Sequence, residues 1–223
     1  MSNAPAMPWA SARFQRIDEN DPQEHLRGGD IVELIAEAKI PSRFGDFRGL
    51  AFRDRRDGSE SMVMVRGDVF GVEDLLVRVH SECFTGDIFG SLRCDCRDQL
   101  EQALALLGQQ QEGALVYLRQ EGRGIGLGNK IRAYSLQEAG LDTVEANHAL
   151  GFEDDLRDYA IAADVLRVLG VASIQLLTNN PRKIEDLQGL GIQVNGRVPL
   201  QMEPNDFNAA YLETKRDKSG HLL

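Results

Sequence analysis

The sequence contains no apolar stretch long enough to cross a membrane. A membrane-spanning helix needs about 20 consecutive apolar residues, and no run among the 223 residues approaches that length. The first residues also lack the apolar segment of a secretory signal peptide. We therefore expect a cytoplasmic protein with no membrane partner.

An excess of positive charge is missing as well. Lys and Arg number 25 against 35 Asp and Glu, so the formal net charge is −10. Proteins that bind nucleic acids usually carry a basic face, so we expect no nucleic-acid partner. A local group of cations can still bind a small anion such as a phosphate, whatever the net charge.

Cysteine is scarce, and all three cysteines lie in one segment, CFTGDIFGSLRCDC, at residues 83–96. Three thiols cannot all pair within one chain, and a reducing cytosol disfavours disulfides. Either the thiols are buried as small apolar side chains, or they bind a metal, and zinc suits three thiolates. Their crowding into one polar, glycine-bearing segment favours zinc bound by Cys83, Cys94 and Cys96.

The fourth position of such a zinc site decides its role. A site with three protein ligands keeps a position for water and is typical of catalytic zinc, whereas His80 as a fourth ligand would make the site structural. The sequence leaves both possibilities open. Three thiolates also outweigh the charge of Zn²⁺, and Arg78 and Arg93 are the nearby cations in sequence that would offset the excess.

Strands that alternate with helices predict the fold class. The predicted strands are apolar and rich in β-branched residues, and they cover 61–69, 74–82, 113–120, 173–180 and 192–200. The predicted helices show helical apolar spacing or a capped start, and they cover 97–107, 130–140, 155–170 and 180–191. This alternation indicates an α/β fold in which helices are layered around a mixed β-sheet in a single domain.

The two ends of the chain are expected to differ from this domain, which we place at residues 38–205. Residues 1–37 are predicted to form a partly flexible N-terminal extension, ending in a short helix that stops before Pro41. Residues 206–223 are polar and are predicted to be a mobile tail.

A glycine-rich segment, RQEGRGIGLGNKIR, follows a predicted strand and leads into a predicted helix at residues 119–132. Backbone N–H groups at a helix N-terminus, together with arginines, suit phosphate binding. The segment lacks the G-K-[ST] ending of a Walker loop, so a flexible turn with a solvated basic face is the alternative. TNNPRK, at 178–183, is a second strand-to-helix junction with cations. Two such junctions fit a nucleotide bound at the ends of the strands.

Together these segments resemble the GTP cyclohydrolase II family, whose enzymes open riboflavin biosynthesis. The matching stretches are VRVHSECFTGDIFGSLRCDCRDQL, RQEGRGIGLGNKIRAYSLQEAG, DTVEANHALGF, RDY, LLTNNPRK and ETKRDKSGHLL. The resemblance runs from about residue 38 to the C-terminus, so it implies that 38–205 is the catalytic domain. One departure is Arg97, which stands beside the cysteines where glycine is expected.

The resemblance implies a zinc-dependent homodimer that converts GTP to formate, pyrophosphate and 2,5-diamino-6-(5-phosphoribosylamino)pyrimidin-4-one, with Mg²⁺ accompanying the triphosphate. The implied metal ligands are Cys83, Cys94 and Cys96. The implied catalytic residues are Tyr134, Asp155 as proton acceptor and Arg157 as nucleophile. The implied GTP-binding residues are Arg78, Val79, His80, Ser81, Glu82, Gln99, Glu121, Gly122, Arg123, Thr143, Thr178 and Lys183.

The chemistry of these residues leaves alternatives open. A guanidinium is almost always protonated, so Arg157 is equally suited to stabilising charge on the α-phosphate while water attacks. Without the resemblance, Tyr134 would be interpreted as a tyrosine at the rim of the core, and Asp155 and Arg157 as the charged first turn of a helix. The alternative functions are a paralogue that retains the formyl group and a zinc-stabilised nucleotide-binding module without turnover.

Overall fold

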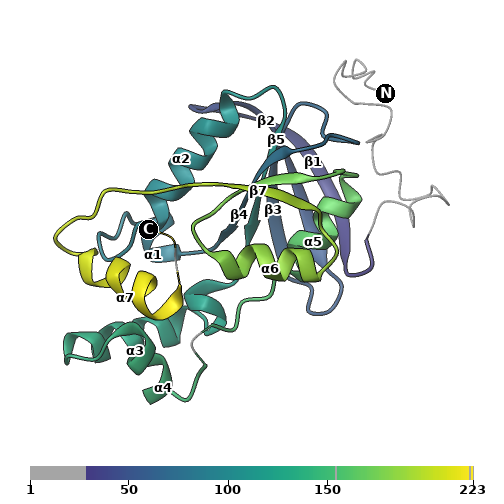
Figure 1. Cartoon of the computed structure of the whole chain (residues 1–223). Helices are drawn as coiled ribbons and strands as arrows, with labels where there is room; N and C mark the ends of the chain where they lie inside the picture. Colours follow the sequence, from purple (N-terminus) through teal and green to yellow (C-terminus); the bar gives the residue numbers. More distant parts are fainter. Residues whose placement is uncertain (1–28, 154, 221, 223) are drawn as a thin grey trace, which may run out of the picture.

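The fold is built on one sheet whose seven strands have the order β1-β2-β3-β5-β4-β6-β7 (Figure 1). This computed structural model describes residues 29–153, 155–220 and 222. The strands are β1 (Val32–Ser42), β2 (Gly45–Asp54), β3 (Glu60–Arg66), β4 (Leu75–Ser81), β5 (Gly113–Leu118), β6 (Ile174–Leu177) and β7 (Val194–Val198). The helices are α1 (Phe84–Asp87), α2 (Cys96–Gly108), the 3₁₀ turn η2 (Glu121–Gly124), α3 (Leu127–Glu138), α4 (Thr143–Ala149), α5 (Ala160–Val168), α6 (Pro181–Gly189) and α7 (Ala209–Ser219).

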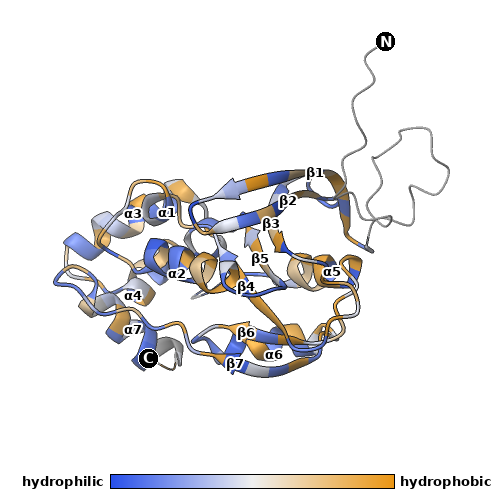
Figure 2. Ribbon diagram, turned by 90° about the horizontal axis from the view of Figure 1, so that it is seen from above, coloured by the Kyte–Doolittle hydropathy of each residue, from blue (hydrophilic) through white to orange (hydrophobic). Residues whose placement is uncertain are grey.

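The sheet has an antiparallel half and a parallel half that share β5. Strands β1, β2, β3 and β5 pair antiparallel, whereas β4 pairs parallel with β5 and β6, and β6 pairs parallel with β7. The carboxyl ends of parallel strands lie at one edge of a sheet, where α/β proteins commonly bind ligands. Helices α3, α4 and α7 gather beyond this edge (Figures 1 and 2).

Helices cover both faces of the sheet, because successive residues of a strand point to opposite faces. On β6, Leu176 packs in the core formed with α5 and α6, whereas Leu177 packs in the core formed with α2. The apolar residues of α5 and of the strands beneath it are visible in Figure 2. This layering confirms the predicted α/β fold with helices around a mixed sheet.

The prediction of a short helix before Pro41 is wrong, because residues 32–42 form β1. Val32 and Leu34 are buried while Glu33 is exposed, so the alternation of a strand outweighs the helical spacing. The start of β1 is held by Asp164 of α5, whose carboxylate accepts backbone N–H bonds from residues 30, 31 and 32. The predicted boundary between residues 37 and 38 falls inside β1, and residues 1–28 lie outside the described residues.

Three further elements differ from expectation. The helix predicted from residue 155 starts only at Ala160, and residues 155–159 have no regular secondary structure. Helix α4, which was not predicted, begins with a capping box between Asp142 and Glu145. The C-terminal segment predicted to be mobile contains α7.

The start of α6 agrees with the sequence. The Asn180 side chain accepts the Arg182 N–H at 3.1 Å as N-cap, and Pro181 occupies the first helical position, where its missing N–H costs nothing.

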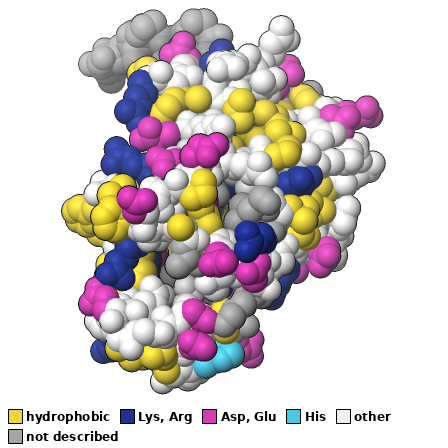
Figure 3. Space-filling model, turned by 60° about the vertical axis from the view of Figure 1, so that its left-hand side comes forward, with side chains coloured by type: hydrophobic (Ala, Val, Ile, Leu, Met, Phe, Trp, Pro, Cys, Tyr) yellow, Lys and Arg dark blue, Asp and Glu magenta, His cyan; other side chains and the backbone are white. Residues whose placement is uncertain are grey.

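The described part of the chain contains no helix with both the length and the hydropathy needed to cross a bilayer. On the face drawn in Figure 3, Lys and Arg side chains alternate with Asp and Glu and do not merge into one basic surface.

Candidate active site

A cavity of about 610 Å³ opens where the carboxyl ends of β4, β5 and β6 meet the helices beyond the sheet. Among its lining residues are the predicted Arg78, His80, Ser81, Glu82, Cys83, Cys94, Cys96, Gln99, Glu121, Gly122, Arg123, Tyr134, Thr143, Arg157, Thr178 and Lys183. Two predicted residues do not line the cavity. The Val79 side chain is buried in the core of the sheet, and Asp155 lies behind Arg157.

The three thiols form a cluster at one side of this cavity. Cys83 follows β4, Cys94 lies in the loop before α2, and Cys96 begins α2. Their sulfur atoms all lie within 4.8 Å of one another, and all three cysteines are free. Three convergent thiolates fit a zinc ion, and hydrophobic burial alone does not require such convergence.

Gly86 leaves room for this cluster. A Cβ atom at position 86 would lie 2.8 Å from Cys94 Sγ and 3.0 Å from Cys83 Sγ. Both distances are too short for a carbon–sulfur contact, so a side chain here would occupy the space that the thiols need. The absence of a Cβ is a second feature, besides the donor set, that fits a bound metal.

His80 is not part of the metal-ligand group. Among the described residues, the group of potential ligands contains only the three cysteines. His80 Nε2 lies 3.3 Å from both carboxylate oxygens of Asp87. Asp87 also accepts hydrogen bonds from the Tyr117 hydroxyl at 2.7 Å and from the Cys83 backbone N–H at 2.9 Å. The geometry thus gives no support to a closed structural site with His80 as fourth ligand.

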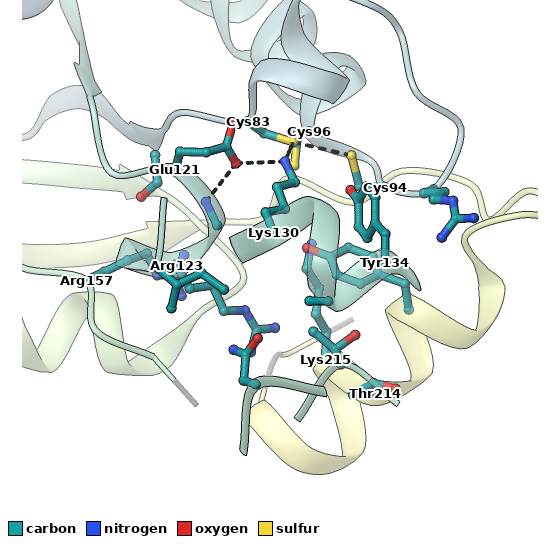
Figure 4. Close-up of a pocket in the computed structure, with 18 of the residues that line it drawn as sticks. Cys83, Cys94, Cys96, Glu121, Arg123, Lys130, Tyr134, Arg157, Thr214 and Lys215 are labelled. Carbon is teal, nitrogen blue, oxygen red and sulfur yellow. Dashed lines mark hydrogen bonds and ion pairs between the residues drawn. The ribbon is translucent and has the colours of Figure 1, made fainter. Parts of the chain in front are cut away.

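The cation that contacts a thiol is Lys130, which was not predicted. Lys130 Nζ lies 3.0 Å from Cys83 Sγ and 2.7 Å from Glu121 Oε1 (Figure 4). Of the two predicted cations, Arg93 instead pairs with Glu138 and lies over the Tyr134 ring. The sequence held one indication that Lys130 lies near the site. Residue 130 is four positions before the predicted Tyr134, so the two side chains share one face of α3.

The cysteine cluster perturbs its own protonation. Hydrogen bonds from Cys94 and then Cys96 hold the pKa of the Cys83 thiol well below its usual range, and the charge of Lys130 acts in the same direction. A thiolate at Cys83 is the form that binds a metal.

Two buried basic side chains that line the cavity donate to uncharged acceptors. Arg78 donates to the Leu177 carbonyl and to Gln99, both at 2.8 Å, and burial lowers its pKa to about 10. Lys183 donates to the Val79 carbonyl at 2.7 Å. Burial and then the charges of Arg78 and Arg157 lower the pKa of Lys183 well below its usual value. Buried charges of one sign favour a ligand of the other sign.

Arg157 and Asp155 form a bidentate ion pair in the irregular segment before α5. Arg157 Nε lies 2.8 Å from Asp155 Oδ1, and Nη2 lies 2.5 Å from Oδ2. Burial lowers the pKa of Arg157, but the hydrogen bonds to Asp155, together with the charges of Tyr159 and Asp155, raise it overall. Arg157 therefore remains a cation facing the cavity.

The segment carrying Arg157 packs directly on the glycine-rich turn. The Leu156 N–H donates to the Arg123 carbonyl at 3.0 Å, and a Cβ at Gly124 would lie 3.0 Å from Leu156. Gly122 and Arg123 both have left-handed φ angles, of 62° and 60°. The turn thus brings residues 121–124 and 155–157 to the same wall of the cavity.

Tyr134 of α3 lies beside the thiol cluster (Figure 4). Its hydroxyl is 3.4 Å from the Thr85 hydroxyl, which is 3.8 Å from Cys83 Sγ. Burial raises the pKa of Tyr134, so this phenol is protonated at neutral pH and is a proton donor.

Helix α7 also lines the cavity. Its residues were not predicted for the site, because this segment was expected to be a mobile tail. Tyr211, Thr214 and Lys215 line the cavity. Lys215 Nζ lies 2.7 Å from Asp95 Oδ1, and Asp95 is only 1% exposed between Cys94 and Cys96. Helix α7 is thereby tied to the loop that carries these two cysteines.

Arg97, the departure from the family pattern, points away from this site. Its guanidinium pairs with Glu101 one turn along α2 at 3.0 Å, and its side chain is 45% exposed. Arg97 does not line the cavity.

Comparison with known proteins finds relatives that are named as riboflavin biosynthesis proteins. The chain is 52% identical over 198 residues to the riboflavin biosynthesis protein RibBA of Chlorobium phaeovibrioides, covering 89% of this chain and 48% of that protein. It is 56% identical over 194 residues to RibBA of Bacillus subtilis, covering 86% and 49%. The chain thus spans about half the length of these relatives.

A solved structure, RibBX, a two-domain 3,4-dihydroxy-2-butanone 4-phosphate synthase from A. baumannii, matches 78% of this chain and 42% of that chain with a TM-score of 0.45 and 20% identity. The sequence profile of the GTP cyclohydrolase II family matches residues 33–199. The chain therefore belongs to the GTP cyclohydrolase II family.

Proposed function

We propose that this chain is a zinc-dependent GTP cyclohydrolase II. It hydrolyses GTP to formate, pyrophosphate and 2,5-diamino-6-(5-phosphoribosylamino)pyrimidin-4-one, the first step of riboflavin biosynthesis. The observation that carries the proposal is one cavity that is lined both by three convergent thiols and by the buried cationic side chains of Arg78 and Lys183. The reaction needs both, because it hydrolyses a purine ring and releases pyrophosphate.

The three thiols are suited to hydrolysis of the purine ring. Loss of C8 as formate requires water to add at C8 and again at the resulting formyl group. Cys83, Cys94 and Cys96 would hold zinc, which when bound supplies an activated water. Tyr134, protonated and adjacent to the thiol cluster, is placed to donate a proton to the ring nitrogen that leaves.

The basic side chains that line the cavity are suited to binding the triphosphate. Arg78 and Lys183, with the backbone of the turn at 121–124, would bind phosphate oxygens, and Mg²⁺ would accompany GTP. Arg157 stabilises the charge that develops on the α-phosphate while water attacks. Asp155 orients the guanidinium through its bidentate pair, and the raised pKa of Arg157 speaks against its acting as a neutral nucleophile.

The cellular setting and assembly belong to the same proposal. Three free cysteines fit a reducing compartment such as the cytoplasm. A homodimer is proposed from the family resemblance alone.

The test is product analysis by mass spectrometry after incubating zinc-loaded protein with GTP and Mg²⁺, with formate and pyrophosphate assayed in parallel. Equal amounts of formate and pyrophosphate, together with the diaminopyrimidine, are expected. Pyrophosphate without formate would instead identify a paralogue that retains the formyl group, and absence of turnover would identify a binding module. The Cys94→Ser variant should lose both zinc and formate release.

A further inference from the structure

Lys130 is a cation whose ammonium hydrogen-bonds a cysteine of the thiol cluster. Its ammonium lies 3.0 Å from Cys83 Sγ, and the lysine is only 8% exposed. Figure 4 shows its side chain rising from α3 between Glu121 and Cys83. A buried ammonium at this distance from a sulfur atom is directed by its surroundings and is not a flexible surface group.

Glu121 holds the ammonium in this position. Its Oε1 accepts from Lys130 Nζ at 2.7 Å and from the Gly122 N–H at 2.7 Å, and its Oε2 accepts from the Phe84 N–H at 2.6 Å. The carboxylate charge is thus shared among three donors from the glycine-rich turn, α1 and α3. Glu121 anchors Lys130 without saturating it, because a lysine ammonium has three N–H donors.

An N–H···S hydrogen bond has a defined effect on a thiolate that binds a metal. Three thiolates outweigh a divalent cation by one negative charge, so such a metal acidifies bound water less than one held by neutral imidazoles. A cation that donates to one thiolate draws electron density from the sulfur and weakens its donation to the metal. Groups that hydrogen-bond metal ligands commonly change metal affinity or activity by about 10- to 100-fold.

We propose that Lys130 is a positioning residue that tunes the metal through Cys83, making the metal a stronger Lewis acid than three free thiolates allow. The consequence for catalysis rests on the proposed function, but the effect on the metal site does not. Arg93 differs from Lys130 in this respect, because its guanidinium is engaged with Glu138.

The test replaces zinc with Co²⁺, whose thiolate-to-metal charge-transfer band reports on the sulfur ligands. In Lys130→Met, which has a similar length and neither charge nor donor, the band is expected at longer wavelength than in the wild-type protein. Arg93→Met is the matched control, because it removes the same charge beside Cys94 in sequence. Its band is expected to stay at the wild-type position.

An unchanged band in cobalt-loaded Lys130→Met would overturn the proposal, as would an equal shift in Arg93→Met. Where Lys130→Met does not fold or bind cobalt, Lys130→Arg and Lys130→Gln take its place. Arginine keeps the cation and glutamine does not, so the glutamine band is expected at longer wavelength than the arginine band. Coincident bands in this pair would overturn the proposal too.

GTP turnover is then a separate readout. With zinc stoichiometry unchanged, Lys130→Met is expected to lower formate release by about 10- to 100-fold. If the wild-type protein releases no formate, the proposed function fails, while the cobalt spectra still decide the role of Lys130. If the band shifts in Lys130→Met but formate release does not fall, Lys130 affects the sulfur ligands without making the metal a stronger Lewis acid. That result would overturn the inference.

Discussion

At the scale of single residues, Gly86 is the clearest link between sequence and metal binding. A methyl group at this position would lie 2.8 Å from Cys94 Sγ, and the thiols can avoid it only by turning away from one another. We expect Gly86→Ala to fold but to bind zinc about 10- to 100-fold more weakly, as measured by competition with a chromophoric chelator. Gly128→Ala is the control, since no atom lies within 4 Å of a Cβ there. Equal zinc affinities in the two variants would contradict the role of Gly86.

Arg157 offers a second test at this scale. If it stabilises charge, Arg157→Met should slow pyrophosphate release by about 10²- to 10³-fold, the usual cost of removing such a group. Arg157→Lys keeps the charge but loses the bidentate geometry, so we expect it to be intermediate. The measurement is a stopped assay of pyrophosphate at saturating GTP. Equal rates for the two variants would argue against charge stabilisation.

The residue scale also shows what the sequence could not reveal. The cysteine spacing predicted the cluster of three thiols, and the residues predicted for the site include 16 of the 33 residues that line the cavity. Lys130 was missed because its partner Cys83 is 47 positions away, and no local pattern encodes a contact of that range. Arg78 and Arg93 were chosen as charge partners by sequence proximity, whereas side-chain direction decides which cation reaches the sulfur.

At the scale of elements, the buried pair of Lys215 and Asp95 joins α7 to the loop that carries Cys94 and Cys96. Lys215→Met would leave the Asp95 carboxylate buried and unpaired, and we expect a loss of about 3 to 5 kcal/mol in the free energy of unfolding. Urea unfolding of zinc-loaded protein provides the measurement. Adding Asp95→Asn should recover part of the loss, because the unpaired charge is removed. No recovery in the double variant would show that packing of α7, and not the ion pair, is what matters.

The helices and strands differ in how well their local sequence predicts them. Strands β4 and β5 and helix α2 were predicted because each has a clear apolar pattern and a glycine or polar boundary. Strand β1 was predicted as a helix because its apolar residues also fit helical spacing, and its pairing with β2 is set by contacts that a window cannot see. Helix α7 was missed because few of its residues are apolar, so its sequence resembles a solvated tail, although Leu212 and Lys215 are buried.

At the scale of the whole molecule, buried carboxylates make stability depend on acid pH. Hydrogen bonds from Arg56 lower the pKa of Asp54 below its model-peptide value of 3.8. A lowered pKa in the folded state stabilises the protein above that value, and the contribution is lost as the pH falls below about 4. We expect the free energy of unfolding, measured in urea at a series of pH values, to decrease over this range.

Comparing the pH dependence of stability of the wild-type protein with that of Asp54→Asn separates the effect of this carboxyl from the effect of protons taken up by the cysteines. The variant should lose stability less steeply with falling pH, by at most about 1.4 kcal/mol per pH unit for the one proton involved. Parallel curves for the two proteins would refute the assignment of acid sensitivity to Asp54.

The pair of Asp95 and Lys215 joins positions 120 residues apart, and this separation has a consequence for biosynthesis. At the usual translation rate of about 5 to 20 residues per second, the ribosome adds Lys215 roughly 6 to 24 s after Asp95. Throughout that interval Asp95 lacks the ammonium that it pairs with in the folded protein. The connection between α7 and the loop that carries Cys94 and Cys96 therefore forms only after residue 215 has been added, whereas all three cysteines lie within the first 96 residues of the sequence.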